Sequence, residues 1–325
     1  MKAAYFKEYG PASKVLQIGE LPDPQPGTDE VRVRVRYSGI NPSDCNRRSG
    51  TRDRPGYPLI IPHSDGAGVI DEVGDGVAKS RIGERVWVWN GQWKRPFGTA
   101  AEYITLPAIQ AVRLPDNVSF EAGACLGIPA LTGFQAVLLA GAKPGDTVLV
   151  TGGAGAVGQY VIQFAKAAGA TVITTISSPE KAALAREVGA DHTIDYKRED
   201  VGARVMEITG GKPVDSIIDM DIASNAKYVS AVLKQKGSVI VYGTSNPQAT
   251  IPAGFGIPNE TKYQFFIVYE LNADERERAV SAVTGALERG ALKHRIAKQT
   301  FALNDIVAAH EAVENVSVGN VVITI

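Results

Sequence analysis

The sequence has only two cysteines, Cys45 and Cys125, among its 325 residues. Two cysteines cannot form a disulfide framework, and neither lies in a C-x-x-C pair, so a four-cysteine zinc site is excluded. No stretch approaches the roughly 18 apolar residues of a membrane helix, and the first residues lack the apolar run of a secretory signal. These absences predict a cytoplasmic protein that does not engage a membrane.

Neither sign of charge is in excess, because 34 Lys and Arg residues stand against 35 Asp and Glu residues. A nearly neutral chain has no strong field to attract polyanions, so nucleic acid is not an expected partner. The hydrophobic content of 44% is that of an ordinary globular protein. A chain of 325 residues exceeds what one core usually organises, which predicts two domains.

The pattern of apolar residues changes along the chain. Residues 31–36 alternate valine with arginine, as in an antiparallel strand with one buried face, and turns rich in Pro, Gly and Asp surround it. From about residue 147, the apolar runs TVLVT, TVITTI, DSIID and SVIVYG alternate with helical stretches, which predicts a parallel sheet with crossover helices. The final run NVVITI has no helix after it, and we expect it to return to the first domain.

A glycine-rich loop directly follows the first of these apolar runs. In TVLVTGGAGAVG, Gly153, Gly155 and Gly158 form the pattern G-x-G-x-x-G at the start of a helix. In a dinucleotide-binding loop the first glycine allows a tight turn, the second admits the pyrophosphate and the third lets helix and strand pack closely. The helix N-terminus then offers free N–H groups to the phosphates. The pattern predicts a Rossmann domain, with an ordinary glycine-rich turn as the alternative.

The end of the next strand favours one nicotinamide dinucleotide over the other. An NAD site places an acid there against the ribose hydroxyls, but this strand runs into Ser177 and Ser178, with Lys181 one turn later. Hydroxyls and an ammonium group can hold a 2′-phosphate, which a carboxylate would repel. We therefore expect NADPH as the cofactor. The alternative is that Ser178 only caps a helix and Lys181 is a solvated lysine.

Eight blocks in register carry a family resemblance along the whole chain. They are GINPSDCNRRSG, IPHSDGAGVIDEVGDGV, GERVWVW, GTAAEYITL, GIPALTGFQAV, VTGGAGAVG, GADHTIDYKRED and GNVVITI. In this order they resemble the zeta-crystallin and quinone oxidoreductase branch of the medium-chain dehydrogenase/reductase superfamily. The resemblance implies an α/β fold in which a GroES-like β-rich catalytic domain (residues 1–122 and 266–325) meets a Rossmann doubly wound parallel-sheet domain (residues 123–265). It also implies a homodimer, or a dimer of dimers, through Rossmann edge strands, with residues 251–271 as the candidate edge.

Zinc-dependent relatives hold a catalytic metal at three points, which align with Asn41, Ser64 and Ile128 of this chain. None of the three supplies a thiolate or an imidazole, and isoleucine has no metal-binding group, so we expect no catalytic zinc. His63 lies one residue before the matching position. One histidine alone cannot hold a metal, and we expect His63 to be structural.

The resemblance also implies roles for individual residues. Asn41 resembles an asparagine beside the nicotinamide, and Asp44 could relay a proton if its pKa were raised. The matching blocks further imply contacts to the nicotinamide, the pyrophosphate and the adenine side of the cofactor, with core or cap packing as the alternative for each aromatic or amide. Together with the 2′-phosphate candidates, the expected cofactor residues are Thr132, Ala154, Gly155, Ala156, Val157, Ser177, Ser178, Lys181, Tyr196, Tyr242, Gly243, Thr244, Phe266, Ile267, Val268 and Asn320.

One departure from the family concerns the substrate. Many relatives carry tyrosines where this chain has Cys45, Asn46 and Arg52, so an aromatic substrate wall is missing there. The tryptophans of VWVWNGQWKRPFG could rebuild an apolar wall or belong to the β-domain core.

The expected reaction is hydride transfer from NADPH to a quinone or an enone, with hydrogen bonds in place of zinc stabilising the negative charge that develops on oxygen. A conjugated acceptor suits this weaker polarisation better than a simple ketone does. Two alternatives remain open. One is a reductase of alkenals or enoyl thioesters, and the other is an NADPH-binding sensor or structural protein in which turnover is incidental.

Overall fold

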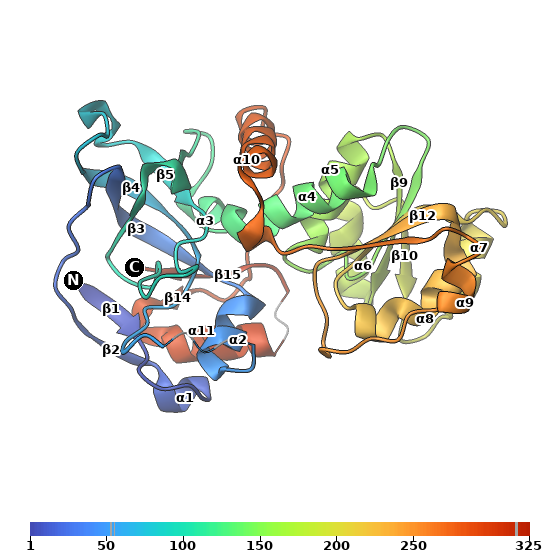
Figure 1. Ribbon diagram of the computed structural model, residues 1–325, viewed down its shortest axis with the longest axis horizontal. Coiled ribbons are helices and arrows are strands. Elements are labelled where there is room, and N and C mark those ends of the chain that lie inside the picture. The colour runs from blue at the N-terminus through green and yellow to red at the C-terminus, as the bar shows by residue number, and fades with distance from the viewer. Residues whose placement is uncertain (53, 55, 316–317) are drawn as a thin grey trace. The chain divides into compact units, whose positions relative to one another are not determined.

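The computed structural model describes residues 1–325 except 53, 55, 316 and 317. It divides into two compact units: unit 1 comprises Met1–Ile128 and Val280–Ile325, and unit 2 comprises Pro129–Ala279. Both ends of the chain, blue and red in Figure 1, therefore belong to unit 1. The expected domain boundaries, after residues 122 and 265, stay a prediction.

Unit 1 is built around a mainly antiparallel sheet with the order β14-β15-β3-β4-β5-β7, in which β6 also pairs with β3. Its strands are β3 (Glu30–Ile40), β4 (Asp65–Val73), β5 (Arg85–Val88), β6 (Tyr103–Pro107), β7 (Ala111–Arg113), β14 (Phe301–Ala302) and β15 (Val321–Thr324), beside the hairpin of β1 (Lys2–Tyr5) and β2 (Gln17–Glu20). The helices are α1 (Ala12–Val15), α2 (Pro42–Ser49), α3 (Phe120–Gly123) and α11 (Ile306–Glu314), with the 3₁₀ turns η1 (Lys79–Arg81), η2 (Ala108–Gln110) and η5 (Leu303–Asp305).

The alternating valines of β3 behave as the sequence predicts. Val31, Val33 and Val35 are buried in a core with residues of β4, β5 and β6, whereas the arginines between them lie on the outer face. β15 pairs antiparallel with β3, setting Val321 opposite Ile40. The expected return of the final strand to the first domain is confirmed.

Unit 2 is a parallel sheet with the order β10-β9-β8-β11-β12-β13. Its strands are β8 (Thr147–Val150), β9 (Thr171–Ile176), β10 (His192–Asp195), β11 (Val214–Asp219), β12 (Leu233–Val241) and β13 (Lys262–Phe265). The connecting helices are α4 (Leu131–Ala140), α5 (Gly158–Ala167), α6 (Pro179–Glu187), α7 (Val201–Ile208), α8 (Ile222–Val232) and α9 (Ala253–Gly256), with the 3₁₀ turn η4 (Val268–Glu270). The order reverses at β8, as in a doubly wound Rossmann sheet, so the expected α/β class is confirmed.

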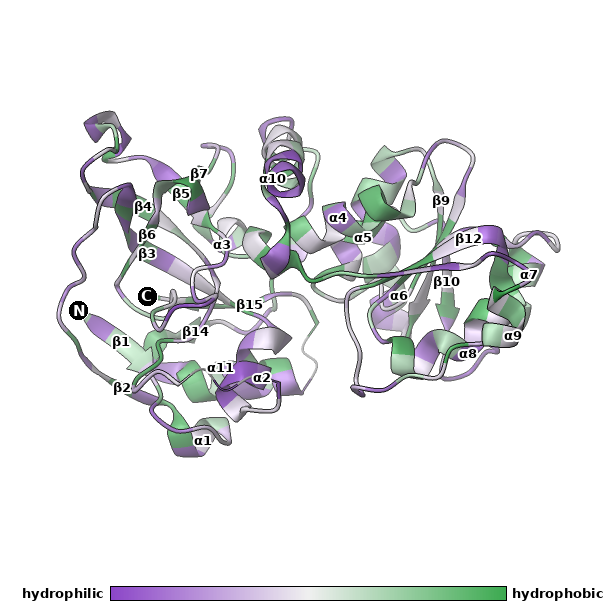
Figure 2. Ribbon diagram, viewed as in Figure 1, coloured by the Kyte–Doolittle hydropathy of each residue, from purple (hydrophilic) through white to green (hydrophobic). Residues whose placement is uncertain are grey.

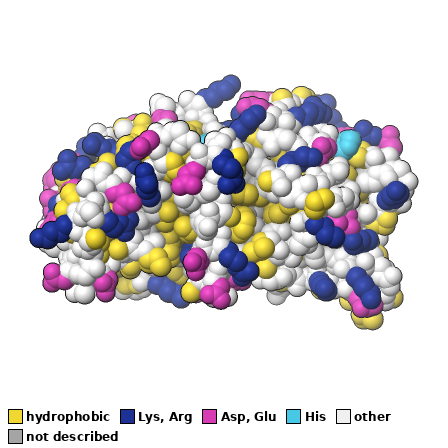
Figure 3. Space-filling view, turned by 90° about the horizontal axis from the view of Figure 1, so that it is seen from above, with side chains coloured by type: hydrophobic (Ala, Val, Ile, Leu, Met, Phe, Trp, Pro, Cys, Tyr) yellow, Lys and Arg dark blue, Asp and Glu magenta, His cyan; other side chains and the backbone are white. Residues whose placement is uncertain are grey.

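Two elements cross the boundary between the units in sequence: the π-helical turn η3 (Leu126–Ala130) and α10 (Ala273–Glu288). In Figure 2, α10 shows the purple of its charged residues, which begin with Asp274 and Glu275 in its first turn. Figure 3 shows Lys and Arg side chains interspersed with Asp and Glu over one face of the molecule. Among the helices of the described residues, none has the length and apolar character to cross a membrane.

Candidate functional site

The three glycines of the loop between β8 and α5 meet different surroundings. A Cβ at Gly153 would lie 2.2 Å from Oγ1 of Thr174, and a Cβ at Gly158 would lie 2.3 Å from the carbonyl oxygen of Gly152. The packing of the protein itself therefore requires these two glycines. A Cβ at Gly155 would meet, within the described part of the chain, only the Gly152 oxygen, at 3.2 Å. The middle glycine thus keeps open a place where the backbone can approach a pyrophosphate.

Hydrogen bonds fix this loop to the carboxyl ends of β9 and β11. Oγ1 of Thr151 donates to Oδ1 of Asp219 at 2.8 Å and accepts from the backbone N–H of Met220 at 3.0 Å. The N–H of Gly152 donates to Oγ1 of Thr175 at 3.0 Å. The loop is therefore held where β8 lies between β9 and β11, which is the switch point at which open α/β sheets bind ligands.

The four residues predicted to contact pyrophosphate all lie in this loop. They are Ala154, Gly155, Ala156 and Val157, and the helix α5 begins directly after them. Gly155 is exposed, whereas Ala154 is buried. The N–H of Gln159 donates to the carbonyl oxygen of Gly155 at 3.2 Å, and those of Tyr160 and Val161 donate to that of Val157 at 2.9 and 3.0 Å. The positive end of the α5 dipole faces the loop, as at a phosphate-binding helix end.

The residues predicted to contact the 2′-phosphate gather at the end of β9. Oγ of Ser178 accepts from the backbone N–H of Lys181 at 3.2 Å, so the capping alternative is confirmed for this hydroxyl. Ser177, just before the N-cap of α6, and Lys181, in its first turn, are half-buried. The N–H of Tyr196 donates to the carbonyl oxygen of Ile176 at 3.1 Å, which places Tyr196 beside the same strand end. The structure thus brings the four residues to one edge of unit 2.

Two further predicted segments also follow strands of unit 2: Tyr242, Gly243 and Thr244 come after β12, and Phe266, Ile267 and Val268 come after β13. They share the carboxyl edge of the sheet because β12 and β13 are parallel. A Cβ at Gly243 would lie 2.3 Å from the carbonyl oxygen of Met220, so this close approach of two chain segments requires glycine.

The remaining two predicted cofactor residues lie in different units. Thr132 is buried in the first turn of α4, in unit 2. Asn320 is buried in unit 1, where its Nδ2 donates to the carbonyl oxygen of Arg295 at 3.1 Å. That bond joins two segments of unit 1, and the predicted phosphate role of Asn320 stays a prediction.

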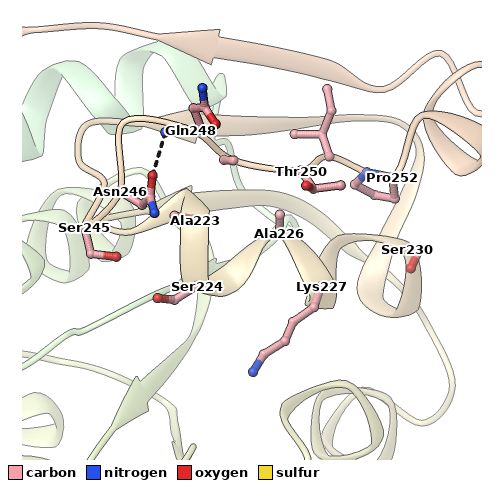
Figure 4. A pocket seen from close by; sticks show the side chains of 12 residues that line it. Ala223, Ser224, Ala226, Lys227, Ser230, Ser245, Asn246, Gln248, Thr250 and Pro252 are labelled. Carbon is pink, nitrogen blue, oxygen red and sulfur yellow. Dashed lines mark hydrogen bonds between the residues drawn. The ribbon is translucent and has the colours of Figure 1, made fainter.

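A groove of about 660 Å³ lies in unit 2 between α8 and the segment after β12, and Figure 4 shows its lining side chains. Polar and apolar side chains share its wall, and the polar ones include Ser224 and Lys227 on α8 and Ser245 on the facing segment. The N–H and Oγ of Ser245 donate to Oδ1 of Asp221 at 2.7 and 2.8 Å. No sequence pattern indicated this groove, because its lining combines residues without a recognisable spacing.

An amide and two carboxyl groups form a buried cluster in unit 1. Asn41 is the N-cap of α2, and its backbone N–H donates to Oδ2 of Asp44 at 2.7 Å. Its Nδ2 donates to Oδ2 of Asp65 at 2.9 Å. Burial raises the pKa of Asp44 to about 6, against the lowering effects of the Asn41 N–H and the Arg47 guanidinium. A carboxyl with such a pKa can exchange a proton near neutral pH.

Asp65 is the member of this cluster that sequence reasoning missed. Its carboxyl is fully buried at the start of β4, and burial raises its pKa well above the ordinary value of an aspartate. The only signal in the sequence is an acid directly after Ser64, one of the aligned zinc positions. Asp65 itself is not one of the three positions that align with the zinc ligands of relatives.

The three aligned positions do not form a zinc site. The Asn41 side chain donates to Asp65, the buried Oγ of Ser64 has no hydrogen-bond partner among the described residues, and Ile128 is aliphatic. In the part of the chain that the structure describes, no group of three His, Cys, Asp or Glu side chains is placed to hold a metal ion. A zinc bound as in the relatives does not fit these donors.

His63 belongs to a buried chain of polar side chains. Its Nδ1 lies 2.8 Å from Oγ of Ser38, and its Nε2 lies 2.9 Å from Nε2 of His310. Nδ1 of His310 lies 3.4 Å from Sγ of Cys45. Burial lowers the pKa of both histidines, that of His310 to about 3, so both are neutral near pH 7. The expected structural role of His63 agrees with these contacts, which join β3, the segment before β4, α2 and α11.

The tryptophans divide between the two interpretations that the sequence left open. Trp87 on β5 is fully buried, which assigns it to the core of unit 1. Trp89 and Trp93 are half-buried, and the guanidinium of Arg47 lies 4.9 Å from the centre of the Trp93 ring. One face of Trp93 is therefore engaged by a cation within unit 1.

Comparisons with known proteins follow the same division of the chain. Residues 27–116 match the alcohol dehydrogenase GroES-like domain, and residues 156–284 match the zinc-binding dehydrogenase family. A quinone oxidoreductase of Pseudomonas aeruginosa is 33% identical over 319 residues, covering 95% of this chain and 94% of that protein. A 2-haloacrylate reductase of a Burkholderia species is 31% identical, covering 96% and 94%.

Among solved structures, the quinone oxidoreductase of Escherichia coli complexed with NADPH superimposes with a TM-score of 0.89. It is 28% identical in sequence, and the match covers all of both chains. The expected GroES-like and Rossmann architecture is confirmed by these matches.

Proposed function

Because this chain belongs to the quinone oxidoreductase, or zeta-crystallin-like, branch of the medium-chain dehydrogenase/reductase superfamily, we propose that it uses NADPH to reduce a quinone or a related conjugated carbonyl compound without zinc. The observation that carries the proposal is the loop at the switch point of unit 2, where Gly155 leaves open space beside the backbone. The solved relative from Escherichia coli, a quinone oxidoreductase, was determined with NADPH bound. The residues of this loop fit such a dinucleotide.

The residues of this chain would hold the cofactor through its phosphates. The loop before α5 offers backbone N–H groups to the pyrophosphate, and the ammonium of Lys181 with the hydroxyl of Ser177 would bind the 2′-phosphate. Tyr196 lies at the same strand end. When bound, NADPH supplies the hydride.

The proton that accompanies the hydride has a candidate source in unit 1. Reduction of a quinone to a hydroquinone consumes one hydride and one proton, and the proton must reach a carbonyl oxygen. We assign this transfer to Asp44, since its pKa of about 6 lets it be protonated in part near neutral pH. Asn41, bonded to Asp44 through its backbone N–H, would orient the reacting groups.

A panel of electron acceptors tests the proposal. We expect stopped-flow NADPH oxidation to be fastest with quinones, slower with enones and slowest with plain ketones, because a conjugated acceptor needs less polarisation of its oxygen. Fastest turnover of simple alcohols or ketones would contradict the proposal. Tight binding of NADPH without oxidation by any acceptor would instead favour the sensor or structural alternative.

A second candidate function has a specific observation in its favour. The chain is 31% identical to a protein named 2-haloacrylate reductase, an enzyme of conjugated double bonds. In this second function, the double bond of an alkenal or enoyl substrate is reduced: the hydride adds to its β-carbon and the proton adds to its α-carbon. The same panel, extended to acrylates and alkenals, separates the two functions by their relative kcat/KM. We also propose that the protein acts in the cytoplasm as a homodimer.

A further inference from the structure

The carboxyl of Asp65 is enclosed by the backbone of unit 1 and the side chain of Asn41. Its residue is fully buried, and a Cβ at Gly127 would lie 2.4 Å from its Oδ1. Any side chain at position 127 would therefore displace this oxygen. A Cβ at Gly39 would likewise lie 3.2 Å from the Cβ of Asp65. The two glycines make the space in which the carboxyl lies.

The two oxygens of Asp65 differ in their partners. Oδ2 accepts from Nδ2 of Asn41 at 2.9 Å, and the backbone N–H of Ile128 also hydrogen-bonds to the carboxyl. Oδ1 has no hydrogen-bond partner among the residues described. An ionised carboxylate with one bare oxygen in a dry site is costly, whereas a protonated carboxyl is not charged.

The charged and titratable groups around Asp65 favour the protonated form. Desolvation is the main cause that raises the pKa of Asp65, and the carboxylate of Asp44 on α2 raises it further. The thiol of Cys125, whose own pKa is raised mainly by burial and then by Asp65, supplies no positive charge. Arg47 acts on Asp44 rather than on Asp65. Different neighbours therefore set the pKa values of Asp44 and Asp65, although both carboxyls bond to Asn41.

We infer that Asp65 is a positioning residue for the reduction: it stays protonated through the reaction and, as an uncharged acceptor, holds the carboxamide of Asn41 while Asp44 alone exchanges the proton. This inference rests on the proposed function for its kinetic part. It assigns the two carboxyls different roles, although both lie beside Asn41. Loss of Asp65 frees the Asn41 side chain to rotate and leaves its amide N–H without an acceptor.

The protonation of Asp65 can be observed without any turnover. We expect the infrared spectrum of the wild-type protein, recorded above the pKa of Asp44, to contain a band of a protonated carboxyl group. The isosteric variant Asp65→Asn should lack this band. If the two spectra coincide in that region, Asp65 is ionised and the inference is overturned, whereas the proposed reductase is untouched.

The positioning role is tested by kinetics with quinone and NADPH. We expect Asp65→Ala to lower kcat by roughly 10- to 100-fold with little change in the Kd for NADPH, because a misplaced group near the reacting atoms has such effects. Asp65→Asn, which can still accept from Asn41, should recover most of that loss. The matched control is Asp116→Asn, whose carboxyl is 87% exposed at the surface of the same unit.

The outcomes separate this inference from the reductase proposal. If Asp65→Ala keeps kcat within about threefold of the wild type, or if Asp65→Asn recovers nothing, the positioning role is wrong. If Asp65→Ala does not fold, the infrared comparison decides, because it uses only the isosteric variant. If the wild type oxidises no NADPH with any acceptor, the reductase proposal fails whatever the infrared band shows.

Discussion

Ser178 caps α6 and Lys181 lies in its first turn, but the two residues have separable physical roles. The Ser178 hydroxyl accepts a hydrogen bond from the N–H of Lys181 as a helix cap, so Ser178→Ala should lower the free energy of unfolding by about 1 kcal/mol in chemical denaturation.

Lys181→Ala should weaken binding of NADPH by roughly tenfold or more and leave NADH binding nearly unchanged, because only NADPH carries the 2′-phosphate. Calorimetric titration of both nucleotides measures this. Equal weakening of both would place Lys181 away from the phosphate.

Asp44 gives a second prediction at the scale of one residue. Its pKa is about 6 in the folded protein and 3.8 when unperturbed, so the folded state binds more protons than the unfolded state between these values. The contribution of Asp44 is therefore most favourable below pH 4 and is lost as the pH rises to 6, by about 3 kcal/mol. Denaturation of the wild type and Asp44→Asn should show their difference in stability changing across this window. A constant difference would mean that Asp44 titrates normally.

At this scale, the sequence singled out the turn at the start of α6 and the buried acid Asp44, but not Asp65, and the contacts to the cofactor stay a prediction. The turn from Ser177 to Lys181 is contiguous, so residue types and a cap pattern were enough to identify it. The surroundings of Asp65 depend on Asn41, 24 residues earlier, which donates to its carboxyl. They also depend on Gly127, whose lack of a side chain leaves space for that carboxyl. No periodicity or motif connects these positions, because the contacts exist only after the sheet of unit 1 has formed.

The glycine loop between β8 and α5 gives a prediction for a whole element. Gly158→Ala should lower the free energy of unfolding, because the new Cβ would lie 2.3 Å from the Gly152 oxygen. Gly155→Ala meets only one described atom, at 3.2 Å, so its main effect should be a raised Kd for NADPH with a smaller loss of stability. Thermal unfolding with and without NADPH measures both effects. Equal losses of stability would show that Gly155 is also needed by the fold.

The strands could be predicted where burial follows one regular pattern along the strand, either alternating or continuous. The alternation in β3 and the apolar runs of β8, β9, β11 and β12 each follow from one sheet with defined faces. The role of Trp87 was not predictable, because Val86, Trp87 and Val88 are all buried and β5 shows no alternation. The π-helical turn η3 was also unexpected, since its Pro129 suggests only an interruption.

For the molecule as a whole, the edge of the unit 2 sheet bears on the proposed homodimer. Among the described strands, β13 pairs only with β12, and Phe265 on it is 64% exposed. An edge strand presents unpaired backbone N–H and C=O groups, and these are a template for pairing with another chain. We expect the wild type to sediment as a dimer and Phe265→Lys to raise the dimer Kd at least about tenfold.

A control for this prediction comes from the other unit. Phe97 is 46% exposed in unit 1, so Phe97→Lys makes the same chemical change away from β13. This variant should sediment like the wild type. A monomeric wild type, or equal dissociation of both variants, would contradict the assignment of the interface to β13.

The place of β15 between β14 and β3 has a consequence for biosynthesis. Residues 321–324 leave the ribosome after all of unit 2, although their partner Tyr37–Ile40 emerges early. While unit 2 is being translated, the backbone of this segment of β3 has not yet paired with β15. Its unpaired N–H and C=O groups can pair with a wrong strand. A chain whose translation stops before residue 321 would thus contain a complete unit 2 and a unit 1 that lacks β15. Chaperones and proteases would have to remove this species.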